Sequence, residues 1–386
     1  MESVVIVGFG AAGLACAEAL RQAGWAGRLT ILSAETEPPY DRPPLSKQYL
    51  SGEWDARKLL LAGEKRIDAL GADIRWGRSA VAVDTAARVV VDDAGETHPY
   101  DGLVIAVGVQ PVRIPGTDVP GMHVLRTRED ADGLREALAA DDGLLVVGGG
   151  FLGLEVAAGA RELGKDVTVV EPLPLPLGTK LPEQVARRLV ALHRAHGVEV
   201  LAGVGLSSVA LDDGRLSGVV LDDGREVPAR TALMAVGARP RLAWLDGSGL
   251  VVEDGIVCDD HCRAASRVWA AGDVARWQHR GLGRSIRLEH RMNATEQGRY
   301  VARDVLGLED GPFVPTPFFW TDHFGVRVQS AGDPEPPVAA AFAEGDEGAD
   351  SFLLEYRDDG RLLAGIGWNA PRSLVAVRRE LSGVPA

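Results

Sequence analysis

Cysteine is scarce in this chain, with three residues in 386. Cys16 lies in an alanine-rich run and is expected to be a small core residue. Cys258 and Cys262 are spaced C-x3-C, which matches neither a C-x-x-C redox pair nor half of a zinc site whose second half is visible. We therefore expect no disulfide framework and no metal site, and so low a cysteine content suits a reducing cytoplasm.

Long apolar runs and an excess of basic charge are also missing. No apolar run approaches the ~20 residues that span a bilayer. The formal net charge of −14 argues against a general nucleic-acid or membrane-surface role. The chain opens with MESVVIVGFG, so no secretory signal is evident. These absences predict a cytoplasmic protein with neither a nucleic-acid nor a membrane partner.

Glycine is abundant by contrast, with 47 residues. Two stretches that each follow a short apolar strand, VVIVGFGAAGLA and LLVVGGGFLGLE, carry the fingerprint of a dinucleotide-binding turn. The first glycine permits the tight strand-to-helix turn, the second lets the backbone approach a pyrophosphate, and the third lets the helix pack closely on the sheet. The helix N-terminus then offers N–H groups to the phosphates. The glycines are Gly8, Gly10 and Gly13 in the first turn and Gly148, Gly150 and Gly153 in the second.

An acidic residue follows each fingerprint at the distance that a ribose contact requires. The segment LTILSAE is predicted to be a strand that ends at Glu35, and VTVVE is predicted to end at Glu171. A carboxylate there can accept the ribose hydroxyls of an adenosine. Two such units predict a flavin and a nicotinamide held together for hydride transfer, with FAD and NADH as cofactors. The alternative is two unrelated glycine-rich turns in an α/β protein.

The order of predicted elements is that of a doubly wound α/β protein. The first fingerprint belongs to a unit with predicted strands at 4–7, 29–32 and 101–108. The same pattern of strands and helices begins again at Leu144 and ends with a segment over 233–240. A further strand is predicted over 268–274. From about Pro312 alternating patterns indicate a small antiparallel domain, with a loop or hairpin over 335–350. The predicted fold is α/β, with two Rossmann-like dinucleotide-binding domains of the glutathione-reductase-like kind and a small α+β C-terminal domain. The domains are FAD-binding (1–114 and 243–313), NADH-binding (115–242) and C-terminal (314–386).

Five motifs in order give the chain a resemblance to a known family. They are GFGAAGLA (8–15), PPYDRPPLSK (38–47), GGGFLGLE (148–155), VWAAGDVARW (268–277) and EHRMNATEQG (289–298) followed by PFFWTDHFGVRVQ (317–329). The chain resembles the FAD- and NADH-dependent ferredoxin reductases that serve oxygenases and cytochromes P450, the group that includes putidaredoxin reductase and biphenyl dioxygenase reductase. The resemblance implies an NADH:ferredoxin oxidoreductase whose partner is a small iron–sulfur ferredoxin, and it covers nearly the whole chain.

The resemblance also implies roles for particular residues. Lys47 and Glu155 would form a catalytic ion pair beside the flavin, with Trp320 on the side used by the partner. Asp273 would bind the ribityl chain of FAD, and Arg42 and Pro44 would shape the flavin loop. The remaining cofactor contacts implied are Ala12, Val81, Gly108, Glu289, Leu152 and Gly237. Alternatively, Lys47 is a solvated loop residue, Glu155 a first-turn helix acid and Trp320 a packing residue.

The chain departs from the family at two places. The loop after Glu171 reads EPLPLPLGTKL, with Leu175 and Thr179 where relatives usually carry arginines that help to hold NAD. A loop with no cation immediately after Glu171 favours NADH over NADPH. His323 replaces the usual glutamine of the aromatic motif, where it is either a titrating group or a structural histidine.

Other functions remain open at this point. Disulfide or peroxide reductases share the architecture but need a reactive cysteine, and no cysteine lies between Cys16 and Cys258; Ser46 stands near the position of one such cysteine. A flavoprotein resembling apoptosis-inducing factor would use NADH to switch a binding surface. Rubredoxin reductases and nitrite reductase components differ only in the acceptor.

An acidic ferredoxin would need a basic docking surface on this acidic chain. Two arginine-rich stretches could supply it, and the resemblance implies that both lie near the flavin edge, close to Trp320. They hold Arg276, Arg280, Arg284 and Arg287, and Arg372, Arg378 and Arg379. The alternative is that these arginines are solvated or pair with nearby carboxylates.

Overall fold

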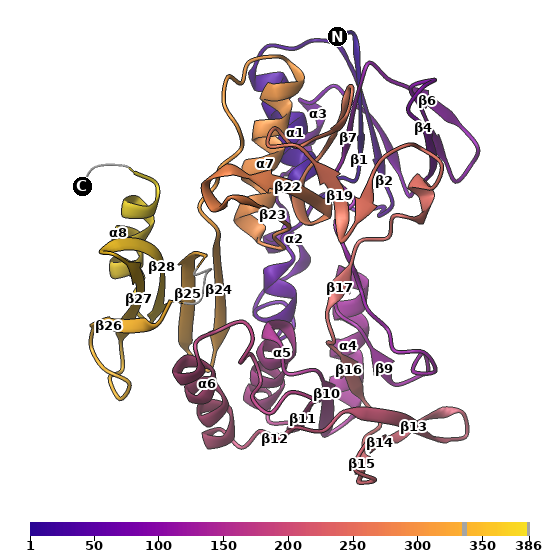
Figure 1. Cartoon of the computed structure of the whole chain (residues 1–386). Helices are drawn as coiled ribbons and strands as arrows, with labels where there is room; N and C mark the ends of the chain where they lie inside the picture. The colour runs from indigo at the N-terminus through magenta and orange to yellow at the C-terminus, as the bar shows by residue number, and fades with distance from the viewer. Residues whose placement is uncertain (334–337, 384–386) are drawn as a thin grey trace. The chain divides into compact units, whose positions relative to one another are not determined.

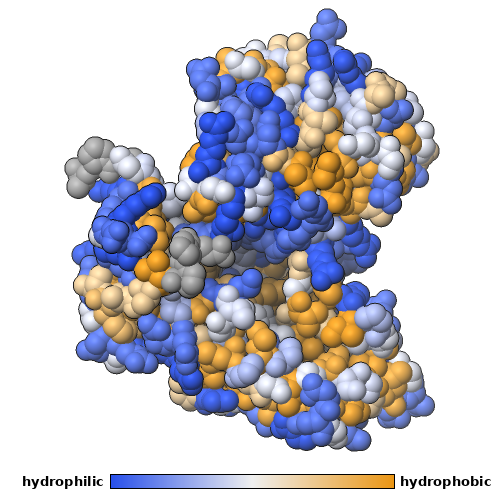
Figure 2. Space-filling view, viewed as in Figure 1, coloured by the Kyte–Doolittle hydropathy of each residue, from blue (hydrophilic) through white to orange (hydrophobic). Residues whose placement is uncertain are grey.

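The computed structural model describes residues 1–333 and 338–383 and divides the chain into two units, each discontinuous in sequence (Figure 1). Unit 1 consists of Met1–Asp41, Leu60–Gln110 and Arg239–Phe319. Unit 2 consists of Arg42–Leu59, Pro111–Ala238 and Trp320–Ala386. Each unit contains one glycine fingerprint. Polar and apolar residues are interleaved on the visible face of each unit (Figure 2).

Unit 1 is built on a six-stranded sheet of order β20-β21-β7-β1-β2-β3. All neighbouring strands run parallel except β20, which pairs antiparallel with β21. Two smaller sheets, β4-β5-β6 and β18-β19-β22-β23, complete it. The elements are β1 (Ser3–Val7), α1 (Ala11–Gln22), β2 (Arg28–Ser33), α3 (Glu64–Asp68), β3 (Asp73–Trp76), β4 (Ala80–Asp84), β5 (Val89–Asp92), β6 (Thr97–Pro99), β7 (Gly102–Ile105), β18 (Val252–Glu253), β19 (Gly255–Cys258), β20 (Arg263–Ala265), β21 (Val268–Ala270), β22 (Ala275–His279), β23 (Arg284–Ile286) and α7 (Arg291–Val305).

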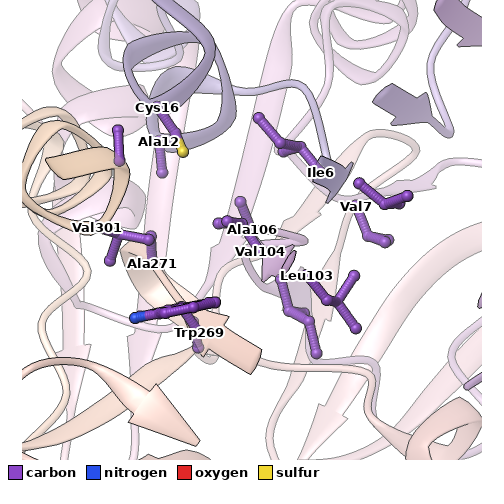
Figure 3. Close-up of a cluster of buried hydrophobic side chains, with 14 of the residues drawn as sticks. Ile6, Val7, Ala12, Cys16, Leu103, Val104, Ala106, Trp269, Ala271 and Val301 are labelled. Atoms are coloured by element: carbon purple, nitrogen blue, oxygen red, sulfur yellow. The ribbon is translucent and has the colours of Figure 1, made fainter. Parts of the chain in front are cut away.

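The core of unit 1 is formed by the central strands and the helices that cover them. Ile6 and Val104 are fully buried on adjacent strands, and Cys16 and Val301 are fully buried on α1 and α7 (Figure 3). After their first residues, Ser3 and Gly102, both central strands are continuous runs of Val, Ile and Leu, as expected of parallel strands that are covered on both faces. The predicted core position of Cys16 is confirmed.

Unit 2 repeats this design with a five-stranded parallel sheet of order β12-β11-β10-β16-β9. A three-stranded antiparallel sheet, β13-β14-β15, extends from it. The elements of this part are η1 (Pro43–Ser46), α2 (Ala56–Leu59), β9 (Met122–His123), α4 (Arg128–Ala140), β10 (Gly143–Val147), α5 (Phe151–Glu162), β11 (Asp166–Glu171), α6 (Glu183–Ala195), β12 (Glu199–Ala202), β13 (Leu206–Asp212), β14 (Arg215–Leu221), β15 (Glu226–Pro228) and β16 (Ala232–Met234).

The last part of unit 2 is a five-stranded sheet of order β24-β25-β28-β27-β26 whose pairings from β25 to β26 are antiparallel. Helix α8 packs on β25 and β28 (Figure 1). Its elements are β24 (Phe318–His323), β25 (Val326–Gly332), β26 (Ala340–Glu344), β27 (Phe352–Asp358), β28 (Arg361–Trp368) and α8 (Pro371–Leu381). The predicted antiparallel C-terminal sheet is therefore present.

The fold prediction is confirmed as a mixed α/β protein with two dinucleotide-binding sheets and a small C-terminal α+β part. Three strands end earlier than predicted: β2 stops at Ser33, so that Glu35 lies beyond it, β7 stops at Ile105 and β21 stops at Ala270. The hairpin expected over 335–350 lies partly outside the described residues, and the described part forms β26 paired with β27. The predicted domain boundaries at 114, 242 and 313 stay predictions.

Candidate functional site

The first glycine turn has the backbone that a pyrophosphate cradle needs. Gly8 has a φ of +103°, and a Cβ there would lie 2.3 Å from the carbonyl oxygen of Ala106. A Cβ on Gly13 would lie 2.0 Å from the carbonyl oxygen of Gly8. Gly10 is the N-cap of α1, and a Cβ there would meet nothing within 4 Å. The first and third glycines are therefore required by the fold, and the second faces open space.

The second turn repeats this geometry closely. Gly148 has a φ of +111°, and its Cβ would lie 2.4 Å from the carbonyl oxygen of Ala235. A Cβ on Gly153 would lie 2.1 Å from the carbonyl oxygen of Gly148, and Gly150, the N-cap of α5, again faces open space. Neither helix has an acidic residue in its first turn. Both turns therefore fit the pyrophosphate of a dinucleotide at a bare, partly positive helix N-terminus.

The two predicted ribose acids have different surroundings. Glu35 is half-buried and accepts a hydrogen bond from the hydroxyl of Tyr40. Glu171 is buried, and its Oε2 accepts from the backbone N–H of Gly149 at 2.7 Å while its Oε1 accepts from that of Leu173 at 2.9 Å. Each carboxylate oxygen can accept more than one bond, so both acids retain capacity for ribose hydroxyls.

Helix α7 brings unpaired polar atoms to unit 1 that sequence reasoning missed. The side-chain oxygen and nitrogen of Asn293 and the Nδ1 of His290 are buried without a hydrogen-bond partner among the described residues. Burial lowers the pKa of His290 to about 4, against the opposing charge of Asp273. Orphaned buried polar groups mark places where a ligand completes the bonding. The motif EHRMNATEQG contains both residues and is the signal that could have found them, although the resemblance assigns a cofactor contact only to its Glu289.

Asp273 lies in the turn η3 (Gly272–Val274), which α7 holds in place. The side-chain oxygen of Gln297 accepts from the backbone N–H of Gly272 at 2.8 Å. A Cβ on Gly298 would lie 2.3 Å from the carbonyl oxygen of Ala12, so glycine permits α7 to approach α1 closely. Ala12 is consequently buried in this helix contact.

Lys47 and Glu155 meet in unit 2, as predicted. The Nζ of Lys47 lies 2.6 Å from Oε2 of Glu155, and their side chains are only 12% and 8% exposed. Ser46 donates to the same oxygen at 2.6 Å, and the Thr321 hydroxyl donates to Oε1 at 2.7 Å. Glu155 is the fifth residue of α5, so the first-turn alternative is wrong, and Lys47 is no solvated loop residue.

The local sequence explains how Lys47 reaches this position. Pro43 and Pro44 fit the first turn of the short helix η1, which directs Ser46 and Lys47 onto α5. Arg42 anchors the start of the turn by donating to the carbonyl oxygen of Arg126 at 2.6 Å.

The other predicted contacts take varied positions. Trp320 is half-buried on β24, and Val81 on β4 is 48% exposed. Gly108 and Gly237 have φ values of +67° and +109° and follow β7 and β16. The remaining two are Leu152, half-buried on α5, and Glu289, which accepts from Arg287 at 2.7 Å.

All three cysteines are buried free thiols. Burial raises the pKa of Cys16 and of Cys258 to about 12 and raises that of Cys262 well above its ordinary value. None of them is a thiolate near neutral pH, so the chain lacks the reactive sulfur of disulfide and peroxide reductases.

The first arginine-rich stretch is largely paired with carboxylates. Arg276 contacts Glu253 at 2.8 Å, Arg280 contacts Asp260, and Arg287 lies 3.2 Å from Asp254 with only 11% of its side chain exposed. Such pairing reduces the positive potential that this stretch can present to an acidic partner.

A family comparison matches nearly the whole chain. Residues 2–298 match the pyridine nucleotide-disulphide oxidoreductase family, and residues 318–383 match the reductase C-terminal family. Among the described residues, no helix combines the length and apolar character needed to cross a membrane.

Individual relatives extend this match. The ferredoxin reductase component of chlorobenzene dioxygenase from Cupriavidus sp. (strain PS12) is 37% identical, over 97% of this chain and 91% of its own length. Rhodocoxin reductase from Rhodococcus erythropolis is 35% identical, over 86% of this chain and 78% of its own length. Putidaredoxin reductase, solved in a covalent complex with putidaredoxin, is 29% identical with a TM-score of 0.94, covering 99% of this chain and 93% of that one. The chain therefore belongs to the pyridine nucleotide-disulphide oxidoreductase family, as one of its FAD- and NADH-dependent ferredoxin reductases.

Proposed function

We propose that this protein passes electrons from NADH through FAD to a ferredoxin, which supplies an oxygenase or a cytochrome P450. The observation that carries the proposal is the pair of glycine turns, which share one backbone geometry and fit two dinucleotides in one chain. The relatives named above act in such electron-transfer systems. The buried, protonated thiols of this chain argue against disulfide or peroxide chemistry.

The first turn is assigned to FAD. Gly8, Gly10 and Gly13 would hold the pyrophosphate, Glu35 a ribose and Asp273 the ribityl hydroxyls. His290, the N-cap of α7, and Asn293 on that helix join this set because their buried polar atoms need partners. The remaining residues assigned to FAD by resemblance are Ala12, Arg42, Pro44, Val81, Gly108 and Glu289.

The second turn is assigned to NADH. Gly148, Gly150 and Gly153 would hold its pyrophosphate and Glu171 its ribose, with Leu152 and Gly237 nearby. Two backbone N–H groups already fix Glu171, so its carboxylate is pre-organised for a free 2′-hydroxyl. The same charge repels a 2′-phosphate, and Pro172 and Leu173 supply no cation to offset it.

Lys47, Glu155 and Trp320 are assigned to the flavin ring by resemblance. Bound FAD would accept a hydride from NADH and return the electrons singly. Lys47 would stabilise negative charge that develops on the ring, and Glu155 keeps the ammonium in place through the 2.6 Å contact. Trp320 would lie on the side that the ferredoxin approaches.

The predicted domains and location belong to the same proposal. Residues 1–114 and 243–313 would form the FAD domain, 115–242 the NADH domain and 314–386 the C-terminal domain. Three free thiols suit a reducing compartment, which supports the cytoplasm.

A reconstitution experiment tests the proposal. The purified protein should be yellow with one non-covalent FAD, NADH should bleach it without oxygen, and a [2Fe–2S] ferredoxin should restore the colour. Asp273→Ala should lower FAD retention more than it lowers folding stability. A folded, colourless protein that takes up no added FAD would overturn the proposal.

A further inference from the structure

Glu155 accepts hydrogen bonds on both of its carboxylate oxygens, and the two sides have different donors. Its Oε2 accepts from the Nζ of Lys47 and from the hydroxyl of Ser46, each at 2.6 Å. Its Oε1 accepts from the hydroxyl of Thr321 at 2.7 Å. Thr321 is fully buried on β24, where the strand's period of two places it on the same face as His323. The side of Glu155 that faces away from the ion pair is therefore held by a buried strand.

The Thr321 hydroxyl has one hydrogen and two neighbours that can take it. Its oxygen lies 2.7 Å from Oε1 of Glu155 and 2.8 Å from Nε2 of His323. An ionised carboxylate only accepts hydrogen bonds, whereas each nitrogen of a neutral imidazole either donates or accepts. The threonine hydrogen is thus directed to Glu155 when Nε2 of His323 carries a hydrogen of its own.

The far end of this hydrogen-bonded group gives the same direction independently. The Nδ1 of His323 lies 3.2 Å from Nε2 of His193 on α6. The Nδ1 of His193 is buried without a partner among the described residues, and a buried N–H without an acceptor is rarer than an unused acceptor. The hydrogen of His193 therefore belongs on Nε2, which donates to His323. The hydrogen of His323 is then on Nε2, and it is donated to Thr321.

Burial keeps both histidines neutral, as this arrangement requires. It lowers the pKa of His193 to about 3, with help from His323 and His196. It lowers the pKa of His323 to about 4, with help from the charge of Lys47 and against a backbone carbonyl of α5 and Asp322. Near neutral pH each ring therefore carries a single hydrogen and donates in one direction only.

We propose that Thr321 and His323 are positioning residues for Glu155. His323 donates to Thr321, which leaves the threonine hydrogen for Oε1 of Glu155 and keeps Oε2 on Lys47. The inference rests on the proposed function, in which Glu155 keeps the Lys47 ammonium in place beside the flavin ring. A carboxylate held on one oxygen alone turns more freely about its last bond and is more readily protonated. The ammonium would then lose its fixed partner.

The departure from the family motif at position 323 fits this role. The resemblance places a glutamine where this chain has His323. A glutamine side chain carries N–H donors, so it shares with a neutral histidine the property that Thr321 requires. With its pKa lowered to about 4, His323 does not titrate near neutral pH. It therefore serves as a hydrogen-bond donor in the folded protein.

Single-turnover reduction by NADH across a pH series tests the role of Thr321. Thr321→Val keeps the shape of the side chain and removes the donor to Oε1 of Glu155. It should slow hydride transfer and raise the pH at which the rate falls to half by at least about one unit, because a hydrogen bond to a charged group is lost. Thr321→Ser keeps the hydroxyl and should restore the profile. The parent's pH profile in Thr321→Val would overturn the proposal.

A buried threonine elsewhere in unit 2 is the matched control. Thr117 is 4% exposed and donates to the carbonyl oxygen of Ile114 at 2.7 Å. Thr117→Val should lower the stability without moving the pH profile, which separates positioning from a general loss of packing.

Two variants test the role of His323 in the same way. His323→Gln keeps an N–H donor and should keep the pH profile of the parent. His323→Leu leaves the Thr321 oxygen without its donor and should move the profile in the same direction as Thr321→Val, by a smaller amount. A parent-like profile in His323→Leu would overturn the part of the proposal that concerns this histidine.

A spectroscopic measurement tests the hydrogen positions without turnover. Nitrogen and proton NMR of the purified protein with labelled histidine should find His193 and His323 neutral near pH 7, each with its hydrogen on Nε2. The Nε2–H proton of His323 should move upfield in Thr321→Val, where its acceptor is gone, and return in Thr321→Ser. A hydrogen on Nδ1 of His323 in the parent protein, or a charged ring, would overturn the proposal.

The same signal reports whether His323 responds to Glu155. The double variant Lys47→Met, Glu155→Leu leaves no unpaired charge, and it removes the acceptor of the Thr321 hydrogen. Because linked hydrogen bonds strengthen one another, the Nε2–H proton of His323 should also move upfield there, and an unchanged signal would count against the proposal. If NADH bleaches no flavin in the parent protein, the proposed function fails and these spectra alone decide the positioning. If the parent is bleached and Thr321→Val keeps its pH profile, only the positioning fails.

Discussion

The two glycine turns of this chain share a backbone and differ in the side chain two residues beyond the third glycine. That residue is Ala15 in unit 1 and Glu155 in unit 2. Both are buried, but Ala15 packs in an apolar core, whereas Glu155 takes hydrogen bonds from Lys47, Ser46 and Thr321. The comparison teaches that the two turns share one backbone geometry, and that a single residue difference on the following helix gives unit 2 a buried ion pair that Ala15 cannot form.

The acids that follow the turns differ in a similar way. Glu35 lies beyond the end of β2 and accepts from a tyrosine hydroxyl, whereas Glu171 ends β11 and accepts from two backbone N–H groups. Side-chain contacts can rearrange when a ligand binds more readily than contacts to the backbone of a turn. Glu171 is therefore held more rigidly than Glu35 for the ribose contact that we propose.

The largest effect on stability and on hydride transfer should come from breaking the Lys47–Glu155 ion pair, which distinguishes the turn of unit 2 from that of unit 1. Glu155→Ala leaves the Lys47 ammonium buried and unpaired, which should lower the free energy of unfolding by about 3–5 kcal/mol and slow hydride transfer. Urea unfolding and single-turnover reduction by NADH measure the two effects. The matched control is Glu183→Ala, whose ion pair with Arg187 is 66% exposed on both sides and should contribute under about 1 kcal/mol. Strictly additive effects of Lys47→Met and Glu155→Leu in the double variant would show that the two side chains act separately.

Substitutions at the third glycine of each turn should weaken the binding of one cofactor without weakening the binding of the other. Gly13→Ala and Gly153→Ala each place a Cβ about 2 Å from a carbonyl oxygen, which should cost roughly 3 kcal/mol or about 100-fold in affinity. Gly13→Ala should lose FAD, and Gly153→Ala should keep FAD and lose NADH. Fluorescence titration of FAD and the NADH dependence of bleaching measure this. Gly10→Ala and Gly150→Ala meet no protein atom, so they should weaken binding without lowering the melting temperature, and a lowered one would count against the cradle.

The fold and the cofactor turns could be predicted because glycine spacing and continuous apolar strands are local signals. The Lys47–Glu155 contact joins residues 108 apart in sequence, and only the resemblance indicated it. The contact between His193 and His323 could not be predicted, because His193 looks like one more residue of an amphipathic helix until β24 is placed beside it. The sequence left the arginine pairing as one of two alternatives, because an ion pair depends on which surface loops fold together.

Acid should lower the stability of the protein through two buried histidines, His193 and His323. The pKa values of His193 and His323 are lowered to about 3 and about 4, so below pH ~6.5 the unfolded chain binds protons that the folded chain does not. As the pH is lowered from about 6.5 towards about 4, the free energy of unfolding should therefore decrease, by up to about 1.4 kcal/mol per pH unit for each histidine. Urea unfolding across this range measures the slope, and His323→Gln should reduce it. An unchanged slope would mean that this histidine is already charged in the folded protein.

The smallest predicted effect concerns coenzyme choice. Because Glu171, in the role that we propose for it, would repel a 2′-phosphate and bond a free hydroxyl, NADH should reduce the flavin at least about tenfold better than NADPH at equal low concentrations. Glu171→Gln should reduce the ratio of the NADH rate to the NADPH rate. If NADH and NADPH reduced the flavin of the parent protein at equal rates, the loop after Glu171, and not Glu171 itself, would govern the coenzyme preference.

The central claim is that two similar turns hold two cofactors that exchange a hydride and then feed a one-electron acceptor. Anaerobic stopped-flow spectroscopy tests it in one experiment, with NADH mixed first and an oxidised [2Fe–2S] ferredoxin second. The account predicts that one NADH bleaches one FAD and that two ferredoxins then restore the flavin spectrum. A flavin that NADH does not bleach, or that stays bleached with every iron–sulfur partner offered, would contradict it.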